Sequence, residues 1–393
     1  MSGMTTIDGE VAPGFEPVRE AFMANFTQRG DIGAAVCVYW HGRPVVDLWG
    51  GVADPETGRP WTRDTLQLVY SATKGATATA AHMLVERGML DLDAPVAKYW
   101  PEFAANGKEG ISVRWLLSHR AGLVTLDQPL PLADALSWEP MAAALAAQRP
   151  LWTPGTAHGY HGRTWGWLAG EVIRRVSGRS PGRFFADEIA GPLGLDFFIG
   201  LPTNERDRVS RMAYRRPDVD LTTVPAESLP VELREQVAAW RNPNSFSNRA
   251  FAVTDPAAID FDSPEVQAAE LPSSNGIGTA RALARMYAAL IGEVDGVRLL
   301  APASLSSATE EQAGGRDEVM VTASRFSSGY MLPTRDNPMT GPNAFGHTGR
   351  GGSLGFADPV QGIAFGYVMN HVISGSDDAR ASSLTEAVLE SLA

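Results

Sequence analysis

The stretch VYSATKGATATAAHMLVERGML, residues 69–90, contains the motif Ser71-Ala72-Thr73-Lys74. The chain has only three lysines, and Lys74 is the one that follows a serine by three positions. A short apolar segment precedes Ser71, and a helical pattern runs from Ser71 to Gly88. We therefore expect Ser71 at a helix N-terminus, with Lys74 one turn further along the same helix face.

This spacing suits nucleophilic catalysis. A serine hydroxyl is a poor nucleophile and needs a base. A lysine can be that base when burial and nearby positive charge lower its pKa, and the helix dipole favours negative charge at the serine. The alternative is that Ser71 only caps the helix and Lys74 lies on the surface, and the spacing alone does not decide between the two.

Two further stretches favour the catalytic interpretation. Tyr160 lies in a loop rich in glycine and histidine just before an amphipathic helix, where its hydroxyl could transfer a proton in a cleft; a packed aromatic residue is the alternative. The stretch FGHTGRGGSLGFADP, residues 345–359, has glycines that allow a ligand to approach the backbone closely. Amides there could complete an oxyanion hole with the amide of Ser71, although a glycine-rich strand edge would look the same.

Taken in order, Ser-x-x-Lys, a loop tyrosine and His-Thr-Gly resemble the serine β-lactamase and penicillin-binding-protein superfamily, most closely the family VIII carboxylesterases. The resemblance covers nearly the whole chain and includes LLSHRAGL (116–123) and NGIGTARALARMY (275–287). It implies Ser71 as the nucleophile, with Lys74 and Tyr160 sharing the proton transfers. It implies that the remaining site residues, which bind the substrate or the oxyanion, are His161, His347, Thr348, Gly349 and the amide of Arg350.

The sequence departs from this pattern at two positions. The second motif reads Tyr160-His161-Gly162, whereas similar enzymes have an asparagine in the third position that contacts the acyl amide of β-lactams. The third motif has His347 where lysine is common, which removes a fixed positive charge that would meet a substrate carboxylate. Both departures favour uncharged esters.

The hydrophobic patterns predict an α+β fold, and the resemblance implies a β-lactamase/transpeptidase-like architecture. We expect a mainly antiparallel sheet flanked by terminal helices, with an inserted α-helical domain and a cleft between the two. The sheet domain would comprise residues 1–70 and 273–393, and the helical domain residues 71–272. The expected helices are 15–28, several within 71–178, 279–291 and 379–392; the expected strands lie in 33–51, with a turn at His41-Gly42, and in 324–332, 343–352 and 362–372.

Residues 204–272 are rich in Pro, Asn and Arg and only weakly periodic, so we expect a long surface excursion there. Its aromatic residues are expected to shape the pocket for the acyl or alcohol group. They include Tyr214, Trp240, Phe246 and Phe251.

Composition limits the partners and the location. The net charge of −12 argues against nucleic acid or an anionic membrane as a partner, and we expect the arginines at 211, 215 and 216 to lie on a solvated face. No run of 18 apolar residues and no secretory signal is present, so the expected location is cytoplasmic if Met1 is the natural start. The single Cys37 is expected to be an inert core residue and His82 a packing residue. No metal-binding cluster and no phosphate-binding glycine loop is found, so no cofactor is expected.

Residues 351–355 also match G-x-S-x-G, the nucleophile elbow of α/β-hydrolases. That elbow needs a helix after its serine, whereas a turn and a strand are expected after Ser353. We expect a structural turn here, with the Ser353 hydroxyl bonded to nearby backbone.

The sequence therefore predicts a serine hydrolase, a carboxylesterase that acts on small to medium esters. One alternative is a β-lactamase or D-aminopeptidase, against which the missing export signal argues. The least favoured alternative is a sensor of the same fold that is acylated without turnover. The expected partner is a small-molecule ester, and the oligomeric state is not predicted.

Overall fold

The computed structural model describes residues 6–215, 223–337, 339–373 and 378–393. Its centre is a sheet made from both ends of the chain, and the pairs within it are antiparallel. The strands, in the order in which they lie side by side, are β1 (Ile7–Val11), β3 (Arg43–Asp54), β2 (Gly33–Trp40), β15 (Ile363–Met369), β14 (Leu354–Asp358) and β13 (Phe345–Thr348). The short β4 (Arg59–Pro60) pairs with β3.

The expected turn joins β2 to β3. Trp40 pairs with Arg43, and both residues of the turn between them have positive φ, 47° at His41 and 77° at Gly42. Two residues with positive φ make the tight turn that fits the twist of a hairpin. The expected turn at His41-Gly42 is therefore confirmed.

The apolar runs of β2 and β15 are explained by a sheet that is buried on both faces. Along β2, Val36 and Val38 belong to one core, whereas Cys37 and Tyr39 belong to the other. Successive side chains of a strand point to opposite faces, so both sets must be apolar. Cys37 is fully buried and burial raises its thiol pKa well above the usual value, as expected of an inert core residue.

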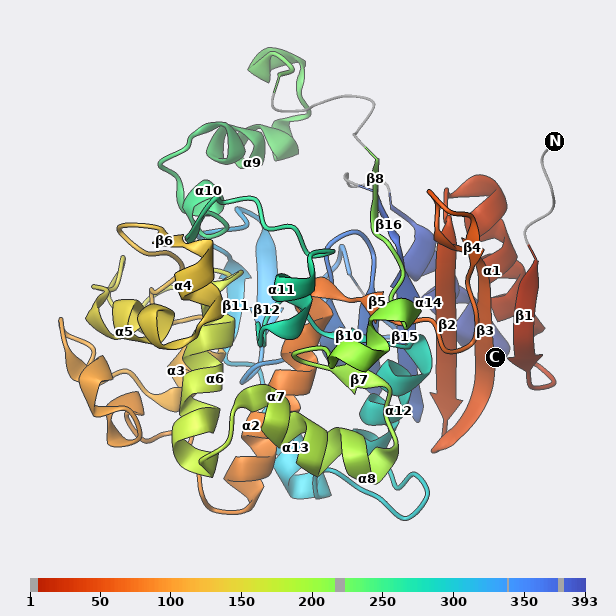
Figure 1. Ribbon diagram of the computed structural model, residues 1–393, viewed down its shortest axis with the longest axis horizontal. Helices are drawn as coiled ribbons and strands as arrows, with labels where there is room; N and C mark the ends of the chain where they lie inside the picture. Colours follow the sequence, from red (N-terminus) through yellow and green to blue (C-terminus); the bar gives the residue numbers. More distant parts are fainter. Residues whose placement is uncertain (1–5, 216–222, 338, 374–377) are drawn as a thin grey trace.

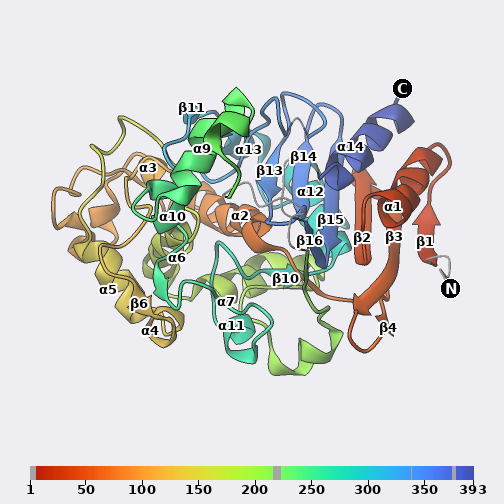
Figure 2. The same cartoon turned by 90° about the horizontal axis from the view of Figure 1, so that it is seen from above.

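Terminal helices cover one face of the sheet and an internal helix covers the other. α1 (Glu16–Gln28) and α14 (Arg380–Ser391) lie side by side, as Figure 2 shows. α12 (Ala280–Ile291) packs against β2, β14 and β15 on the opposite face, and its expected cap Thr279 accepts a hydrogen bond from the amide of Ala282. The α+β fold with terminal helices around an antiparallel sheet is thus as the sequence predicts.

The remaining helices lie mostly in the middle of the chain, to the left of the sheet in Figure 1. They are α2 (Thr73–Glu86), α3 (Val113–Leu117), α4 (Leu132–Leu136), α5 (Glu139–Ala147), α6 (Thr164–Ser177), α7 (Pro181–Phe185), α8 (Gly191–Leu193), α9 (Val231–Arg241), α10 (Phe246–Arg249), α11 (Pro264–Ala268) and α13 (Pro302–Thr309). α2 packs against α6 and also contacts β13, so it lies between the helices and the sheet.

Short strands tie the loops together. They are β5 (Gln67–Leu68) with β10 (Ile277–Gly278) and β7 (Phe197–Phe198), β11 (Ala313–Arg316) with β12 (Ala323–Phe326), β16 (His371–Ile373) with β8 (Ala213–Arg215), and β6 (Leu130–Pro131) with β9 (Thr254–Asp255). The division into two domains at residues 70 and 273 stays a prediction.

Two segments differ from expectation. Residues 204–272 are not only a surface excursion, because they contain α9, a helix of 11 residues that the weak periodicity did not reveal. The expected strand 324–332 ends at Phe326, where a turn through Gly329, with φ of 110°, brings Met331 to pair with Gly346. The three arginines at 211, 215 and 216 were expected on a solvated face. Arg211 is exposed and pairs with Glu56 at 3.0 Å. The side chain of Arg215 and all of Arg216 lie outside the described residues.

No helix among the described residues is both long enough and apolar enough to cross a bilayer.

Candidate active site

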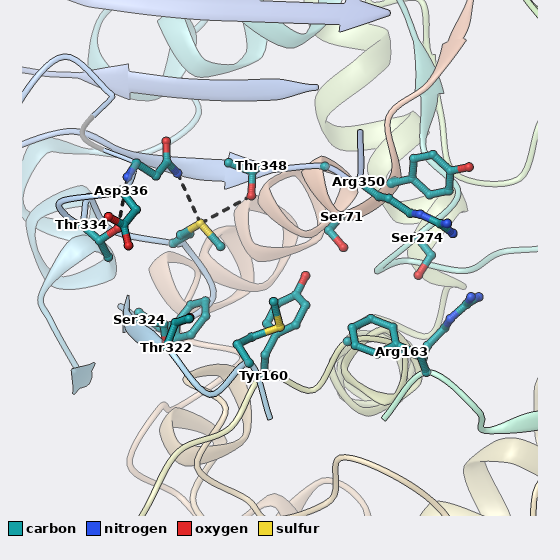
Figure 3. Close-up of a pocket in the computed structure, with 18 of the residues that line it drawn as sticks. Ser71, Tyr160, Arg163, Ser274, Thr322, Ser324, Thr334, Asp336, Thr348 and Arg350 are labelled. Carbon is teal, nitrogen blue, oxygen red and sulfur yellow. Dashed lines mark hydrogen bonds between the residues drawn. The ribbon is translucent and has the colours of Figure 1, made fainter. Parts of the chain in front are cut away.

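Ser71 lies in a single 3-10 turn, Tyr70–Ala72, that leads directly into α2. The residue before it, Tyr70, has a φ of 48°, a left-handed conformation that is uncommon for an aromatic residue. Its hydroxyl is 2.8 Å from that of Tyr214, and its carbonyl accepts a hydrogen bond from the hydroxyl of Thr73. These two hydrogen bonds fix the turn, and Ser71 faces a cavity of about 680 Å³ (Figure 3).

Lys74 is fully buried one turn into α2, beneath Ser71. Its Nζ lies 3.2 Å from Ser71 Oγ, 2.9 Å from the Gly162 carbonyl oxygen and 3.0 Å from the Ser273 carbonyl oxygen. Burial, helped by the positive charge of Arg163, holds the pKa of Lys74 well below the usual lysine value. The amine is therefore easier to deprotonate than an ordinary lysine.

Tyr160 joins the same group from the loop before α6. Its ring centroid is 4.8 Å from Lys74 Nζ, and its side chain lines the cavity with the hydroxyl pointing toward Ser71. Its amide donates to Asp317 Oδ1 at 3.0 Å, which fixes the loop. Burial raises the pKa of Tyr160 above the usual range, partly opposed by the nearby Ser71 hydroxyl, so the phenol carries its proton at neutral pH.

The third motif reaches the cavity through Thr348, Gly349 and Arg350 at the end of β13. A Cβ at Gly349 would lie 2.1 Å from both the Val69 carbonyl oxygen and Ser353 Oγ, so only glycine fits. Among the described residues the amide of Arg350 has no hydrogen-bond partner. The first amides of a helical turn, such as that of Ser71, also lack partners within the helix. These two amides are the ones that the sequence analysis expects to form an oxyanion hole.

Ser353 does not belong to a nucleophile elbow. It is fully buried, strand β14 follows it directly, and its hydroxyl donates to the carbonyl of Val69 at 2.9 Å. That partner is 284 positions away rather than in the local turn, which differs from the sequence expectation. The bond links the start of β14 to the segment that precedes the nucleophile.

Two residues expected in the substrate site lie behind it instead. The ring of His161 is bonded on both sides to backbone, Nδ1 to the Gly159 carbonyl at 2.7 Å and Nε2 to the amide of Leu123 at 3.0 Å, and it is fully buried. His347 is also buried, donates from Nδ1 to its neighbour Thr348, and packs 5.9 Å from the Tyr160 ring. Neither histidine lines the cavity, because the rings are taken up in packing around Tyr160.

These histidines carry no charge at neutral pH. Burial, with a contribution from Lys74, lowers the pKa of His347 to about 3, and burial lowers the pKa of His161 to about 4. His82, about two turns further along α2 than Lys74, is a buried packing residue as expected, stacked 5.8 Å from the Tyr330 ring.

The cavity has a mainly apolar wall. Two of the four expected aromatic residues line it, Trp240 and Phe251, whereas Phe246 packs against Trp152 and Tyr214 borders a neighbouring cavity. The sequence analysis missed the rest of this wall, which comes from separate segments. Its members are Phe261, Met320, Phe326 and Met331.

Gly162, in the position of the absent asparagine, faces this wall. A Cβ at Gly162 would lie 2.5 Å from the ring of Phe251, so that ring occupies the space a larger side chain would need. The replacement is therefore part of how the cavity is built.

Arg163, next in sequence, is one of three charged residues of the cavity lining that the sequence analysis missed, with Arg325 and Asp336. It lines the cavity, with its guanidinium 5.3 Å from the ring centroid of Phe261. Burial and the nearby charge of Arg350 lower the pKa of Arg163 to about 10. Its position directly before α6 and three residues after the motif tyrosine was a usable signal, because it lies on the same loop.

The loop that carries Arg350 is anchored from the C-terminal helix. Arg380 is fully buried and donates to the Gly351 carbonyl at 2.7 Å and the His371 carbonyl at 3.0 Å. Its charge is balanced by Asp31 at 2.8 Å and Asp378 at 2.6 Å. A buried, fully paired arginine of this kind fixes the backbone that it binds.

A buried Ser-x-x-Lys pair at the start of a helix, with a tyrosine opposite and a sheet strand on the third side, defines the class of active-site serine hydrolases that includes β-lactamases and penicillin-binding proteins. The chain belongs to the Beta-lactamase family, whose model matches residues 20–390.

Similar proteins include esterases. Esterase/beta-lactamase LipL of Mycobacterium tuberculosis is 38% identical over 370 residues, which cover 93% of this chain and 83% of that protein. The crystal structure of a family VIII carboxylesterase is 38% identical, with a TM-score of 0.85 over 97% of this chain and 98% of that one. EstA of Arthrobacter nitroguajacolicus Rue61a is 35% identical, with a TM-score of 0.86 over 98% of each chain. The chain is thus an esterase/β-lactamase-like serine hydrolase by family.

Proposed function

We propose that this protein is a carboxylesterase that hydrolyses small to medium carboxylic esters through an acyl-enzyme on Ser71. The observation that carries the proposal is the set of three oxygen atoms around Lys74 Nζ, of which only Ser71 Oγ can act as a nucleophile.

The two carbonyls orient the lysine. A neutral amine has two hydrogens and one lone pair, and a carbonyl oxygen can only accept. The carbonyls of Gly162 and Ser273 therefore take the two hydrogens, and the lone pair is left for the hydroxyl hydrogen of Ser71. The lowered pKa of Lys74 makes this neutral form accessible, which is what a general base requires.

Acylation follows from these positions. Lys74 Nζ takes the proton of Ser71 as Oγ attacks the ester carbonyl carbon, and negative charge develops on the carbonyl oxygen near the amides of Ser71 and Arg350. The C–O bond to the alcohol then breaks. The leaving alkoxide takes a proton from the Tyr160 phenol, which regains one from Lys74, so the free alcohol and the neutral amine are restored.

In deacylation, water takes the place of Ser71 as the nucleophile and Ser71 becomes the leaving group. A water molecule loses a proton to the Tyr160–Lys74 pair as its oxygen attacks the acyl carbon. The Ser71 Oγ–acyl bond breaks, Ser71 recovers a proton, and the carboxylic acid leaves. The same pair thus serves as base and then acid in each half of the reaction.

Three features favour esters over lactams. The mainly apolar wall suits an acyl chain or an apolar alcohol. The ring of Phe251 fills the space of the asparagine that would contact a lactam's acyl amide. The similar proteins named above are described as esterases or as an esterase/β-lactamase.

A panel of substrates separates the alternatives. Turnover of 4-nitrophenyl butyrate well above that of the lactam nitrocefin is expected. The reverse order would favour a β-lactamase or D-aminopeptidase, and a stoichiometric burst without turnover would favour a sensor.

The nucleophile is tested with a fluorophosphonate probe and mass spectrometry. Ser71→Ala should abolish both hydrolysis and labelling. Ser353→Ala should remain within about tenfold of the wild-type rate, because Ser353 only holds the Val69 carbonyl and its loss removes one hydrogen bond. An adduct on the peptide of Ser353, with none on that of Ser71, would overturn the proposal.

A further inference from the structure

We propose, on the basis of the esterase function above, that Arg163 and Arg350 form an anion subsite that binds a carboxylate group of the ester substrate. The substrate class would then be esters with a carboxylate on either the acyl or the alcohol side, such as monoesters of dicarboxylic acids.

The two arginines stand at one end of the active-site cavity. Both line the main cavity and also a second, adjoining cavity of about 430 Å³, so they mark the boundary between the two. Figure 3 shows both side chains extending to the same side of Ser71, with the hydroxyl of Ser274 between them in that view. A substrate bound at Ser71 therefore has both guanidinium groups within its own cavity.

Neither arginine is neutralised by the part of the chain that the structure describes. Arg163 Nη1 is buried without a hydrogen-bond partner, and neither guanidinium forms an ion pair there. What they touch is aromatic: Arg163 lies over Phe261, and Arg350 lies 5.9 Å from the ring centroid of Tyr214. A buried cationic group such as Arg163 Nη1 is normally paired, whereas Arg350 is exposed and can reach an anion from the solvent side of the cavity.

Neither of the two acidic residues near the adjoining cavity forms an ion pair with Arg163 or Arg350. Asp260 borders the adjoining cavity, but its carboxylate accepts the amide of Asp262 at 3.0 Å. Asp262 accepts the amide of Met212 at 3.4 Å. The hydroxyls of Tyr70 and Tyr214 bond with each other at 2.8 Å and supply no negative charge, because burial raises the pKa of both.

The two positive charges also repel each other. Burial and, to a smaller extent, the charge of Arg350 lower the pKa of Arg163. A carboxylate between the two groups would relieve this repulsion and supply acceptors for their N–H groups, a geometry that guanidinium binds in a bidentate manner. Arg163 and Arg350 would in this way supply the positive charge that is absent at His347 in the third motif.

The experiment compares matched pairs of substrates that differ only in charge. On the acyl side, the mono-4-nitrophenyl ester of adipate is compared with the 4-nitrophenyl ester of its monoamide. On the alcohol side, 4-carboxyphenyl butyrate is compared with 4-carbamoylphenyl butyrate. The quantity measured is the ratio of kcat/KM for the anionic member to that for the neutral member, in the wild type, Arg163→Gln and Arg163→Lys.

The ratio should exceed one in the wild type for at least one pair. It should fall roughly tenfold in Arg163→Gln, as expected for the loss of a charge-assisted hydrogen bond, and recover largely in Arg163→Lys. Because the ratio is taken within each variant, a change in Lys74 that affects both substrates equally cancels. As a measurement that needs no variant, adipate should inhibit wild-type hydrolysis of 4-nitrophenyl butyrate more strongly than adipamide does.

The outcomes separate the two proposals. No turnover of any ester, anionic or neutral, would remove the esterase proposal. Turnover of the neutral esters with ratios at or below one for both pairs, or with a ratio unchanged in Arg163→Gln, would overturn the anion subsite alone. Equal inhibition by adipate and adipamide would also overturn it.

Discussion

Lys74 and Lys108 are two buried lysines with nearly the same surroundings. Both are fully buried, and each donates to two main-chain carbonyls: those of Gly162 and Ser273 for Lys74, and those of Ala105 and Gln148, both at 2.6 Å, for Lys108. Each also lies over an aromatic ring, 4.8 Å from the centroid of Tyr160 and 5.4 Å from that of Phe103. Burial lowers the pKa of both, to about 8 for Lys108.

The difference between them is a third oxygen. Ser71 Oγ completes the set around Lys74 and opens onto the cavity, whereas Lys108 ties together two surface segments. A buried lysine with a lowered pKa is therefore not in itself a catalytic base. The reactive hydroxyl at hydrogen-bond distance gives Lys74 that role in the proposed mechanism.

The most direct test of the difference between the two lysines is to replace each of them by arginine. Lys74→Arg should lose about a thousandfold or more in kcat/KM, because arginine does not give up its proton at workable pH. Lys108→Arg should keep kcat/KM within about threefold, although both variants lose about 1–3 kcal/mol of stability from overpacking. If Lys74→Arg kept more than about a tenth of wild-type activity, Lys74 would be no more a base than Lys108.

The second test concerns the ring over each lysine. Tyr160→Phe keeps the ring and removes the hydroxyl, so turnover should fall by about 10²–10⁴-fold while the melting temperature stays close to that of the wild type. The control is Tyr330→Phe, since the Tyr330 hydroxyl is buried and bonds to Thr79 at 2.9 Å but does not line the cavity. That variant should lose only a little stability. Normal turnover in Tyr160→Phe would make Tyr160 a packing residue like Phe103.

A pH profile should distinguish the two lysines by their chemistry. Only neutral Lys74 can accept a proton, so kcat/KM should rise with pH through the pKa of Lys74 and then level off. Because that pKa is lowered, the midpoint of the rise should lie below the usual lysine pKa of 10.5. Arg163→Gln removes a positive charge that lowers this pKa and should move the rise to higher pH, whereas Lys108→Arg should leave it in place. A midpoint at 10.5 in the wild type would contradict the base assignment.

The smallest expected effect is on chain length. Trp240→Ala and Phe251→Ala should change the preference among acetyl, butyryl and octanoyl esters by several-fold, more than they change the rate on the acetyl ester, because both rings line the cavity. Phe246→Ala is the matched control from the same segment, since Phe246 packs against Trp152 instead. An unchanged preference in both cavity variants would mean that Trp240 and Phe251 do not determine the chain length that the pocket accepts.

Local signals in the sequence predicted much of the fold. The hairpin at His41-Gly42, the cap at Thr279 and the helix start at Ser71 each depend on a few neighbouring residues, and each is found where expected. α9 was missed because its polar residues give it little periodicity, and a helix that packs on its neighbours by one short face leaves a weak pattern.

The site was predictable where its residues act through side chains in a motif, and not where backbone or distant packing acts. Ser71, Lys74 and Tyr160 converge as the motifs predict. The carbonyl of Ser273 carries no signal, because any residue has one. His161 and His347 were placed too near the substrate, because a sequence shows that a histidine follows a motif but not that a neighbouring backbone group will hold its ring inside.

Arg380 also bears on the order in which the site is assembled during synthesis. Ser71, Lys74 and Tyr160 lie early in the sequence, whereas the side chain that binds the Gly351 carbonyl comes 309 positions after Ser71. A nascent chain that already contains the first three residues still lacks the group that steadies the loop of Arg350. We therefore expect the site to be complete only after the residues up to Arg380 have been made and folded. A chain truncated before Arg380 is expected to lose activity, although Ser71, Lys74 and Tyr160 all remain.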